Sequence, residues 1–246
     1  MASYTIDINC DVGEGIGNEE SLMPYISSCN IACGGHAGNE KAMQETVKLA
    51  IKHKVKIGAH PSYPDRKNFG REEMEISCAA LFRSMEDQIS RLLKVLKKEN
   101  GQLHHVKPHG ALYNKAARDE KTARTIVEVM KRFHLALKLY VPYGSVIAEI
   151  AKQEDIPLIY EAFADRNYNQ DLTLVSRKEN NALITDPEEM LAHVLRMITN
   201  KKVRCLNGVE VKIEASTFCV HGDNPKAVKL ISFLTNKSAM QNIRIN

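Results

Sequence analysis

The sequence contains no apolar run near the roughly 20 residues that a membrane-spanning helix needs. Residues 1–9 do not join a basic segment to an apolar one, so we expect no secretory signal. The six cysteines include no C-x-x-C pair, so we expect reduced thiols rather than a disulfide framework. These absences predict a cytoplasmic protein with no membrane partner.

A phosphate-binding loop is also absent. No G-x-x-x-x-G-K-[ST] motif occurs, and the Gly-rich stretch 13–17 lacks the G-x-G-x-x-G spacing. Glu19 and Glu20 follow that stretch and would repel phosphate. The net charge of +4 is slight for 246 residues, and the Lys-rich stretches fall near predicted helix ends, where they complement the helix dipole. We therefore expect no nucleic-acid partner.

No repeat and no Pro/Gly/Ser-rich linker divides the chain, so we expect residues 1–246 to form a single domain. Short apolar runs alternate with amphipathic stretches. The predicted strands are Thr5–Asn9, Cys29–Ala32, Val55–Ala59, His105–Lys107, Leu137–Val141, Leu158–Ala162 and Thr217–Val220, with a hairpin arm at Val209–Ile213. The predicted helices are Glu40–His53, Ser77–Asn100, Asp119–Phe133, Ser145–Gln153, Pro187–Thr199 and Pro225–Thr235. This alternation predicts an α/β fold, a (β/α) barrel with seven strands, with a doubly wound open sheet as the alternative.

Polar and titratable side chains gather where these strands end. Such groups are costly at strand ends unless they line a site, and parallel α/β folds place that site at the carboxyl ends of the strands. We therefore expect one mouth of the barrel to gather Asp7, Asn9, Asp11, His36, His60, Lys107, His109, Asp165 and His221. The alternative for Asp7 and Asp11 is that they only cap a turn.

Several pairs near these ends indicate chemistry. Lys107 and His109 lie two residues apart and face one side of an extended segment, where like charge favours a neutral His. We expect both to line a wet mouth, so that replacing either leaves the fold intact. His221 and Asp223 can form a pair that fixes the imidazole tautomer.

Other motif residues have a structural alternative as well as a functional one. Arg71 can hold a carboxylate in a bidentate pair. Asp165 and Arg166 form either a site pair or a surface ion pair. Near these motifs, Cys10, Cys33 and Cys219 are either small buried side chains or partners of a Cys–His nucleophile.

Taken together, the motifs DINCDVGEG (7–15), SCNIACGGHAGN (28–39), GAHPSYPD (58–65) with FGR (69–71), VKPHGALYN (106–114), FADRNY (163–168) and FCVHGD (218–223) closely resemble the lactam-utilisation (LamB/YcsF) family, whose members are also called the A subunits of 5-oxoprolinase. The resemblance runs in order over nearly the whole chain. It implies a barrel related to the glycoside hydrolase and deacetylase barrels. It also implies ATP-dependent opening of 5-oxoproline to L-glutamate, with ATP as co-substrate of a complex that includes the B and C subunits.

Lactam hydrolysis needs a proton-transfer group, stabilisation of developing charge and a cation for the substrate carboxylate. We assign proton transfer to His60, His109 or His221, anion stabilisation to Lys107 or Arg71, and orientation of a His or a water to Asp11. The expected substrate-binding residues are Asp7, Asn9, His36, Asn39, Arg71, Tyr113, Asn114, Asp165, Arg166 and Asp223.

Two other functions stay open from the sequence. In the first, the chain is a metal-dependent amidohydrolase or deacetylase that needs no ATP, with a divalent metal on Asp11, His60 and His109. In the second, it only binds the lactam while the B and C subunits carry out the chemistry. The missing phosphate-binding loop favours a chain with little ATPase activity of its own.

Overall fold

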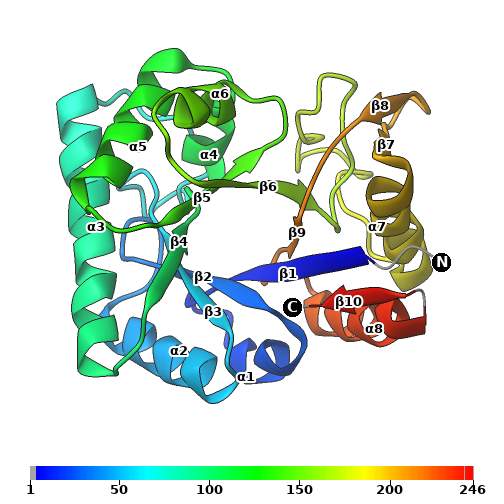
Figure 1. Cartoon of the computed structure of the whole chain (residues 1–246), viewed down its shortest axis with the longest axis horizontal. Helices are drawn as coiled ribbons and strands as arrows, with labels where there is room; N and C mark the ends of the chain where they lie inside the picture. The colour runs from blue at the N-terminus through cyan, green and yellow to red at the C-terminus, as the bar shows by residue number, and fades with distance from the viewer. Residues whose placement is uncertain (1–3, 241, 246) are drawn as a thin grey trace.

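Seven parallel strands close into a barrel in the computed structural model, which describes residues 4–240 and 242–245 (Figure 1). The strands are β1 (Tyr4–Val12), β2 (Ser28–Ala32), β3 (Lys56–His60), β4 (Leu103–Val106), β5 (Lys138–Pro142), β6 (Leu158–Phe163) and β9 (Thr217–Val220). Neighbours pair in chain order, and β9 pairs with both β6 and β1, which closes the ring. The predicted seven-stranded barrel is confirmed, and the open-sheet alternative is wrong.

Helices surround this barrel (Figure 1). They include α2 (Glu40–Lys52), α3 (Cys78–Lys98), α5 (Glu120–Arg132), α6 (Val146–Gln153), α7 (Pro187–Asn200) and α8 (Ala227–Met240). Each lies within a few residues of its predicted bounds, because cap residues mark the starts: Ser77, Asp119, Ser145 and Asp186 each accept a backbone N–H in the first turn. In α3 the helix-spaced apolar residues Leu81, Met85, Leu92 and Leu96 are buried, while Leu93 is only partly buried.

Five short elements among the described residues were not predicted. They are α1 (Glu19–Leu22), η1 (Met23–Tyr25), α4 (Gly110–Ala116), β7 (Lys202–Arg204) and β10 (Ile243–Ile245). The predicted hairpin arm is β8 (Glu210–Lys212), which pairs antiparallel with β7. β10 pairs with the start of β1. Between β6 and α7 the chain runs from 164 to 186 with only isolated β-bridges, and this segment reaches the carboxyl end of the barrel.

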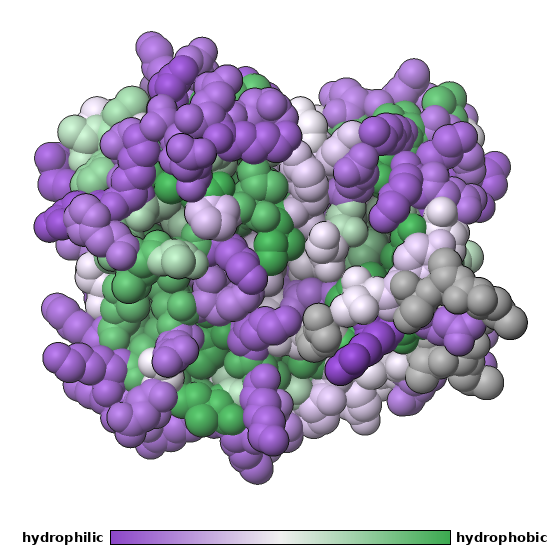
Figure 2. Space-filling view, in the orientation of Figure 1, coloured by the Kyte–Doolittle hydropathy of each residue, from purple (hydrophilic) through white to green (hydrophobic). Residues whose placement is uncertain are grey.

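Hydrophobic side chains fill the space between barrel and helices, and hydrophilic ones form most of the outer rim of the face seen in Figure 2. None of the helices in the described residues is long and apolar enough to cross a membrane. The inside of the barrel differs from this apolar layer, because it carries a column of buried polar groups.

Candidate functional site

Strand β1 places Asp7, Asn9 and Asp11 inside the barrel at successive depths, because alternate residues of a strand share a face. Asp7 accepts hydrogen bonds from the hydroxyls of Ser28 and Thr217, both at 2.6 Å. Ser28 and Thr217 are the first residues of their strands. Asp7 therefore lies toward the amino end of the barrel. The expectation that it joins the carboxyl mouth is wrong.

Asn9 lies two residues closer to the carboxyl end of β1 and belongs to a buried hydrogen-bond network. Its amide donates to Glu161 Oε1 at 2.9 Å and to Thr217 Oγ1 at 2.7 Å, and it accepts from Asn30 at 2.8 Å. His105 Nε2 lies 2.7 Å from Asn30 Oδ1. All of these groups are buried, so Asn9 supports the floor of the site from below rather than facing a ligand.

Lys107 follows β4 and is the charged centre of the site floor. Its Nζ lies 3.0 Å from Asp11 Oδ1, 2.9 Å from Glu161 Oε1 and 3.1 Å from Cys219 Sγ. Burial alone would lower the pKa of Lys107, but the two carboxylates outweigh burial and hold the pKa well above its usual value. Only 2% of Lys107 is exposed. Lys107 reaches the cavity from a buried position. Replacing it leaves buried carboxylates without their counter-charge, which argues against the expectation that its replacement leaves the fold intact.

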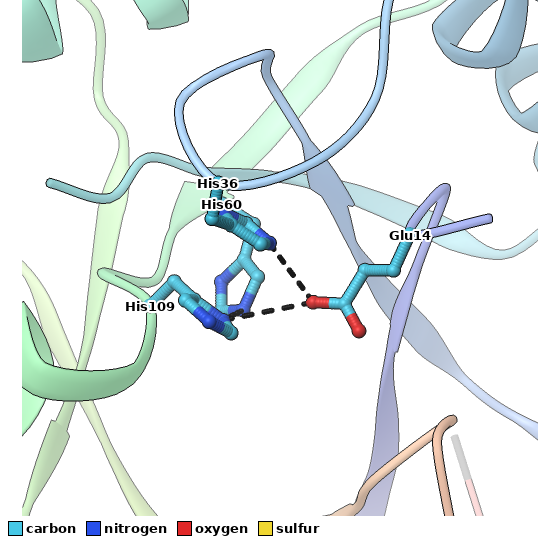
Figure 3. Close-up of side chains that lie close together, drawn as sticks. All are labelled: Glu14, His36, His60 and His109. Carbon is cyan, nitrogen blue, oxygen red and sulfur yellow. Dashed lines mark hydrogen bonds and ion pairs between the residues drawn. The ribbon is translucent and has the colours of Figure 1, made fainter. Parts of the chain in front are cut away.

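Above this floor, three imidazoles and a carboxylate converge from separate segments (Figure 3). His36 follows β2, His60 ends β3, His109 precedes α4 and Glu14 follows β1. Glu14 Oε1 lies 3.0 Å from His36 Nε2 and 3.6 Å from His109 Nδ1. Rings of His36 and His109 stack with centroids 3.7 Å apart, while His60 meets His109 edge-on. We call these four residues the His–Glu cluster.

Burial sets the charge states within the His–Glu cluster. It lowers the pKa of His36 to about 2, with a further contribution from His60. Burial, His60 and His36 also hold the pKa of His109 well below its usual value. Burial and the nearby Asp11 raise the pKa of Glu14 to about 7. His36 and His109 are therefore neutral at physiological pH.

His221, which follows β9, and Asp165, which follows β6, form a His–carboxylate dyad at the carboxyl end of the barrel. His221 Nδ1 lies 2.9 Å from Asp165 Oδ1, and the other Asp165 oxygen accepts from the His221 backbone N–H and from Asn224. Burial would raise the pKa of Asp165, but His221 and Asn224 outweigh it and lower the pKa. The dyad fixes Nδ1 as the protonated nitrogen and leaves Nε2 for the cavity. The predicted partner of His221, Asp223, is therefore wrong.

Asp223 instead binds two arginines at the rim. Arg71 donates to Asp223 Oδ2, and Arg177 donates to the same oxygen at 3.2 Å. These cations outweigh burial and lower the pKa of Asp223. The Arg71 guanidinium also lies 4.8 Å from the ring centre of Phe69. Two cations against one carboxylate leave a net positive rim.

These groups line one cavity of about 470 Å³ at the carboxyl end of the barrel. Of the predicted site residues, it gathers Asp11, His60, Arg71, Lys107, His109, Tyr113, Asn114, Arg166, His221 and Asp223. Arg166 pairs with no carboxylate in the described part of the chain, because its guanidinium donates to the carbonyls of Val175 and Ala182. Asn39 does not line the cavity, since its side chain accepts from Ala42 and caps α2.

Sequence reasoning missed Glu14, Glu161 and Arg177 as site residues. Glu161 had a signal, since it is a charged residue inside the apolar run 158–163. Glu14 had only its place after the Asp7–Asp11 alternation, and Arg177 lies in a long segment without a motif.

The six cysteines are free, as expected. Burial raises the pKa of Cys33 to about 12 and holds those of Cys10 and Cys219 well above usual, so these thiols stay protonated.

Comparison with known proteins agrees with this architecture. The LamB/YcsF family model matches residues 6–246. The 5-oxoprolinase A subunit of Shouchella clausii is 48% identical over 91% of this chain and 90% of its own length. That of Haemophilus influenzae is 42% identical over 98% of both chains.

Solved structures show the same fold. A lactam utilization protein from Thermus thermophilus aligns with a TM-score of 0.92 at 38% identity, covering 98% of this chain and 99% of that one. A family 4 carbohydrate esterase from Streptomyces lividans shares the barrel fold with a TM-score of 0.52 at 10% identity, covering 99% of this chain and 92% of that one. On the family match and these relatives, the chain belongs to the LamB/YcsF family.

Proposed function

We propose that this chain is the A subunit of an ATP-dependent 5-oxoprolinase and that it opens the lactam of 5-oxoproline to L-glutamate within the cavity at the carboxyl end of its barrel. The name of its relatives supports the reaction. One observation carries the assignment of the site: proton-transfer groups and a cationic rim line the same cavity. A small cyclic amide with one carboxylate needs both.

Arg71 and Arg177 are the cations for the substrate carboxylate. Arg71 is exposed at the rim and already holds the carboxylate of Asp223. An incoming carboxylate would compete for the same donors, in the bidentate geometry that guanidinium favours. The lactam ring would then extend inward toward Phe163, Tyr113 and Asn114.

His221 is the proton-transfer residue of this proposal, and Asp165 is its positioning residue. Nδ1–H of His221 stays bonded to Asp165, so Nε2 exchanges protons with a water or with the ring nitrogen. In the proposed reaction the amide oxygen takes the γ-phosphoryl group of ATP. Water adds to the activated carbon, the C–N bond breaks with a proton passed to the nitrogen, and a second water releases phosphate from the acyl phosphate.

Lys107 and Asp11 act below the reacting atoms. Their pair supplies a fixed positive and negative group that need not reorganise during reaction, which is how buried dipoles stabilise developing charge. His60 and His109 line the cavity beside them. We assign ATP handling to the assembled complex, since the sequence offers no phosphate-binding loop.

The test is reconstitution with the purified B and C subunits. Glutamate and phosphate release are measured for the full complex, for each single omission and for this chain alone. The proposal expects release of both products only from the full complex and little ATPase activity from this chain alone. Lactam hydrolysis by this chain without ATP would instead support a metal-dependent amidohydrolase. Turnover by the other two proteins without this chain would support a passive binding role.

A further inference from the structure

We propose that the His–Glu cluster is a binding site for one divalent first-row transition metal ion, with His60 Nε2, His109 Nδ1 and Glu14 Oε1 as its ligands. One ring nitrogen of each imidazole is bonded to a backbone carbonyl. His60 Nδ1 lies 2.7 Å from the carbonyl oxygen of Lys107. His109 Nε2 lies 2.9 Å from the carbonyl oxygen of Phe69. A carbonyl only accepts, so both of these nitrogens carry hydrogen.

The remaining nitrogens then face each other without hydrogen between them. His60 Nε2 and His109 Nδ1 are 2.9 Å apart, and in neutral rings both present a lone pair. Two lone pairs at hydrogen-bond distance repel unless a cation or a proton lies between them. Metal-ligating histidines in proteins are oriented in the same way. One ring nitrogen donates its N–H to a carbonyl, a carboxylate or a water, and the other nitrogen keeps its lone pair for the metal.

Glu14 places a third candidate ligand atom close to this pair of nitrogens, within a small inward shift of the spacing around one ion. Its Oε1 lies 3.6 Å from His109 Nδ1, and the ligand atoms of the cluster all lie within 4.8 Å of one another. Ligand atoms about 2.1 Å from one ion lie about 3.0–3.4 Å apart at right-angled to tetrahedral geometry. Two imidazoles and a carboxylate select zinc, iron or their neighbours over magnesium or calcium.

His36 does not join the ligand set in this arrangement. Its ring is parallel to His109 within 2° and stacks at 3.7 Å, so both lone pairs cannot point in plane at one ion. His36 Nε2 instead bonds Glu14 Oε1 at 3.0 Å and positions that carboxylate. Asp11 Oδ2 is 3.5 Å from His60 Nε2, but Asp11 already balances Lys107.

Charge supports a cation as well. Asp11 and Glu161 share the ammonium of Lys107, and Glu14 adds a third carboxylate beside the histidines, so a divalent ion would neutralise an excess of carboxylate here. Three protein ligands leave coordination positions open toward the cavity that His60, His109 and Glu14 line. Metal binding at this site does not depend on the proposed 5-oxoprolinase activity.

The experiment measures metal binding by the isolated chain, with no lactam, ATP or partner present. The protein is stripped with a chelator and titrated with Co²⁺, whose visible absorption reports its ligand geometry, and then with Zn²⁺ in competition. The variants are Glu14→Gln, His109→Gln, His36→Gln and the cavity-lining control His221→Gln. Circular dichroism checks that each metal-free variant is folded.

We expect one equivalent of metal per chain. Glu14→Gln and His109→Gln should weaken binding by about 100-fold or more, His36→Gln by about 10-fold, and His221→Gln by less than about twofold. If His109→Gln does not fold, the metal affinity of Glu14→Gln tests the proposal by itself, because Glu14 belongs to the loop after β1. Binding of less than one equivalent, or Glu14→Gln and wild type binding alike, would overturn the proposal. This metal-binding result does not depend on whether the reconstituted complex hydrolyses 5-oxoproline.

Discussion

Asp165 and His221 are joined by a 2.9 Å hydrogen bond between Oδ1 and Nδ1, although 56 positions separate them in the chain. The pairing arises because β6 and β9 are hydrogen-bonded neighbours, so their carboxyl ends release both residues at the same place. This hydrogen bond leaves His221 Nε2 free to face the cavity, so we expect the loss of the bond to lower kcat.

Asp165→Asn should lower kcat of the reconstituted complex by about 10²–10⁴-fold with little change in KM, because the amide no longer fixes the tautomer of His221. The measurement is steady-state glutamate release, with Asp171→Asn, an exposed acid outside the cavity, as the matched control. An Asp165→Asn complex with wild-type kcat would remove His221 from the mechanism.

The same substitution has a pH signature in the isolated chain. The pKa of Asp165 is lowered in the folded state, so its ionisation stabilises the fold above its unfolded pKa of about 3.9, and this contribution is lost as pH falls toward the folded value. The difference in unfolding free energy between wild type and Asp165→Asn should therefore shrink below about pH 4. Urea unfolding at several pH values tests this. A difference that grows on acidification would contradict it.

Lys107→Met should destabilise the fold by about 3–5 kcal/mol, because it leaves Asp11 and Glu161 buried without a counter-charge. The control is Lys56→Met, which removes a half-exposed partner of Asp7 and should cost less than about 1 kcal/mol. Chemical denaturation of both variants measures the two values. Equal, small losses would mean that Lys107 does not neutralise the site floor.

Arg71→Met should raise KM for 5-oxoproline by about 10- to 150-fold, the loss of a charged hydrogen bond, with a smaller effect on kcat. Arg118→Met serves as the control, since Arg118 pairs with Glu73 and does not line the site cavity. Steady-state kinetics at several lactam concentrations separates the two constants. An unchanged KM would place the substrate carboxylate elsewhere.

The barrel was predictable because its signals are local. Apolar runs and cap residues such as Ser77 and Asp186 specify strands and helix starts within a few residues. The two-residue period of a strand likewise places Asp7, Asn9 and Asp11 on one face. It does not give their depth in the barrel, which depends on register: Asp7 lies opposite Thr217, the first residue of β9.

The errors at the site have the same origin. Nearness in sequence favours the pairs Asp165–Arg166 and His221–Asp223, whereas the structure pairs Asp165 with His221 and Asp223 with Arg71. Asp165 and Arg166 are adjacent, and adjacent residues on an extended chain point apart. His221 and Asp223 are two residues apart, but the chain turns at 222–223 after β9, so their side chains do not share a strand face. In both cases the partner comes from another element. Asn39 follows a Gly-rich turn like the site residues but caps α2, and either role fits its sequence position.

In the proposed function, 5-oxoproline binds in the cavity between the His221–Asp165 dyad and the cationic rim. The most direct test is a crystal structure of this chain with 5-oxoproline. We predict the substrate carboxylate on the guanidinium of Arg71 and the lactam ring within hydrogen-bond reach of His221 Nε2. A ligand bound elsewhere on the barrel, with this cavity holding only solvent at saturating lactam, would contradict the account.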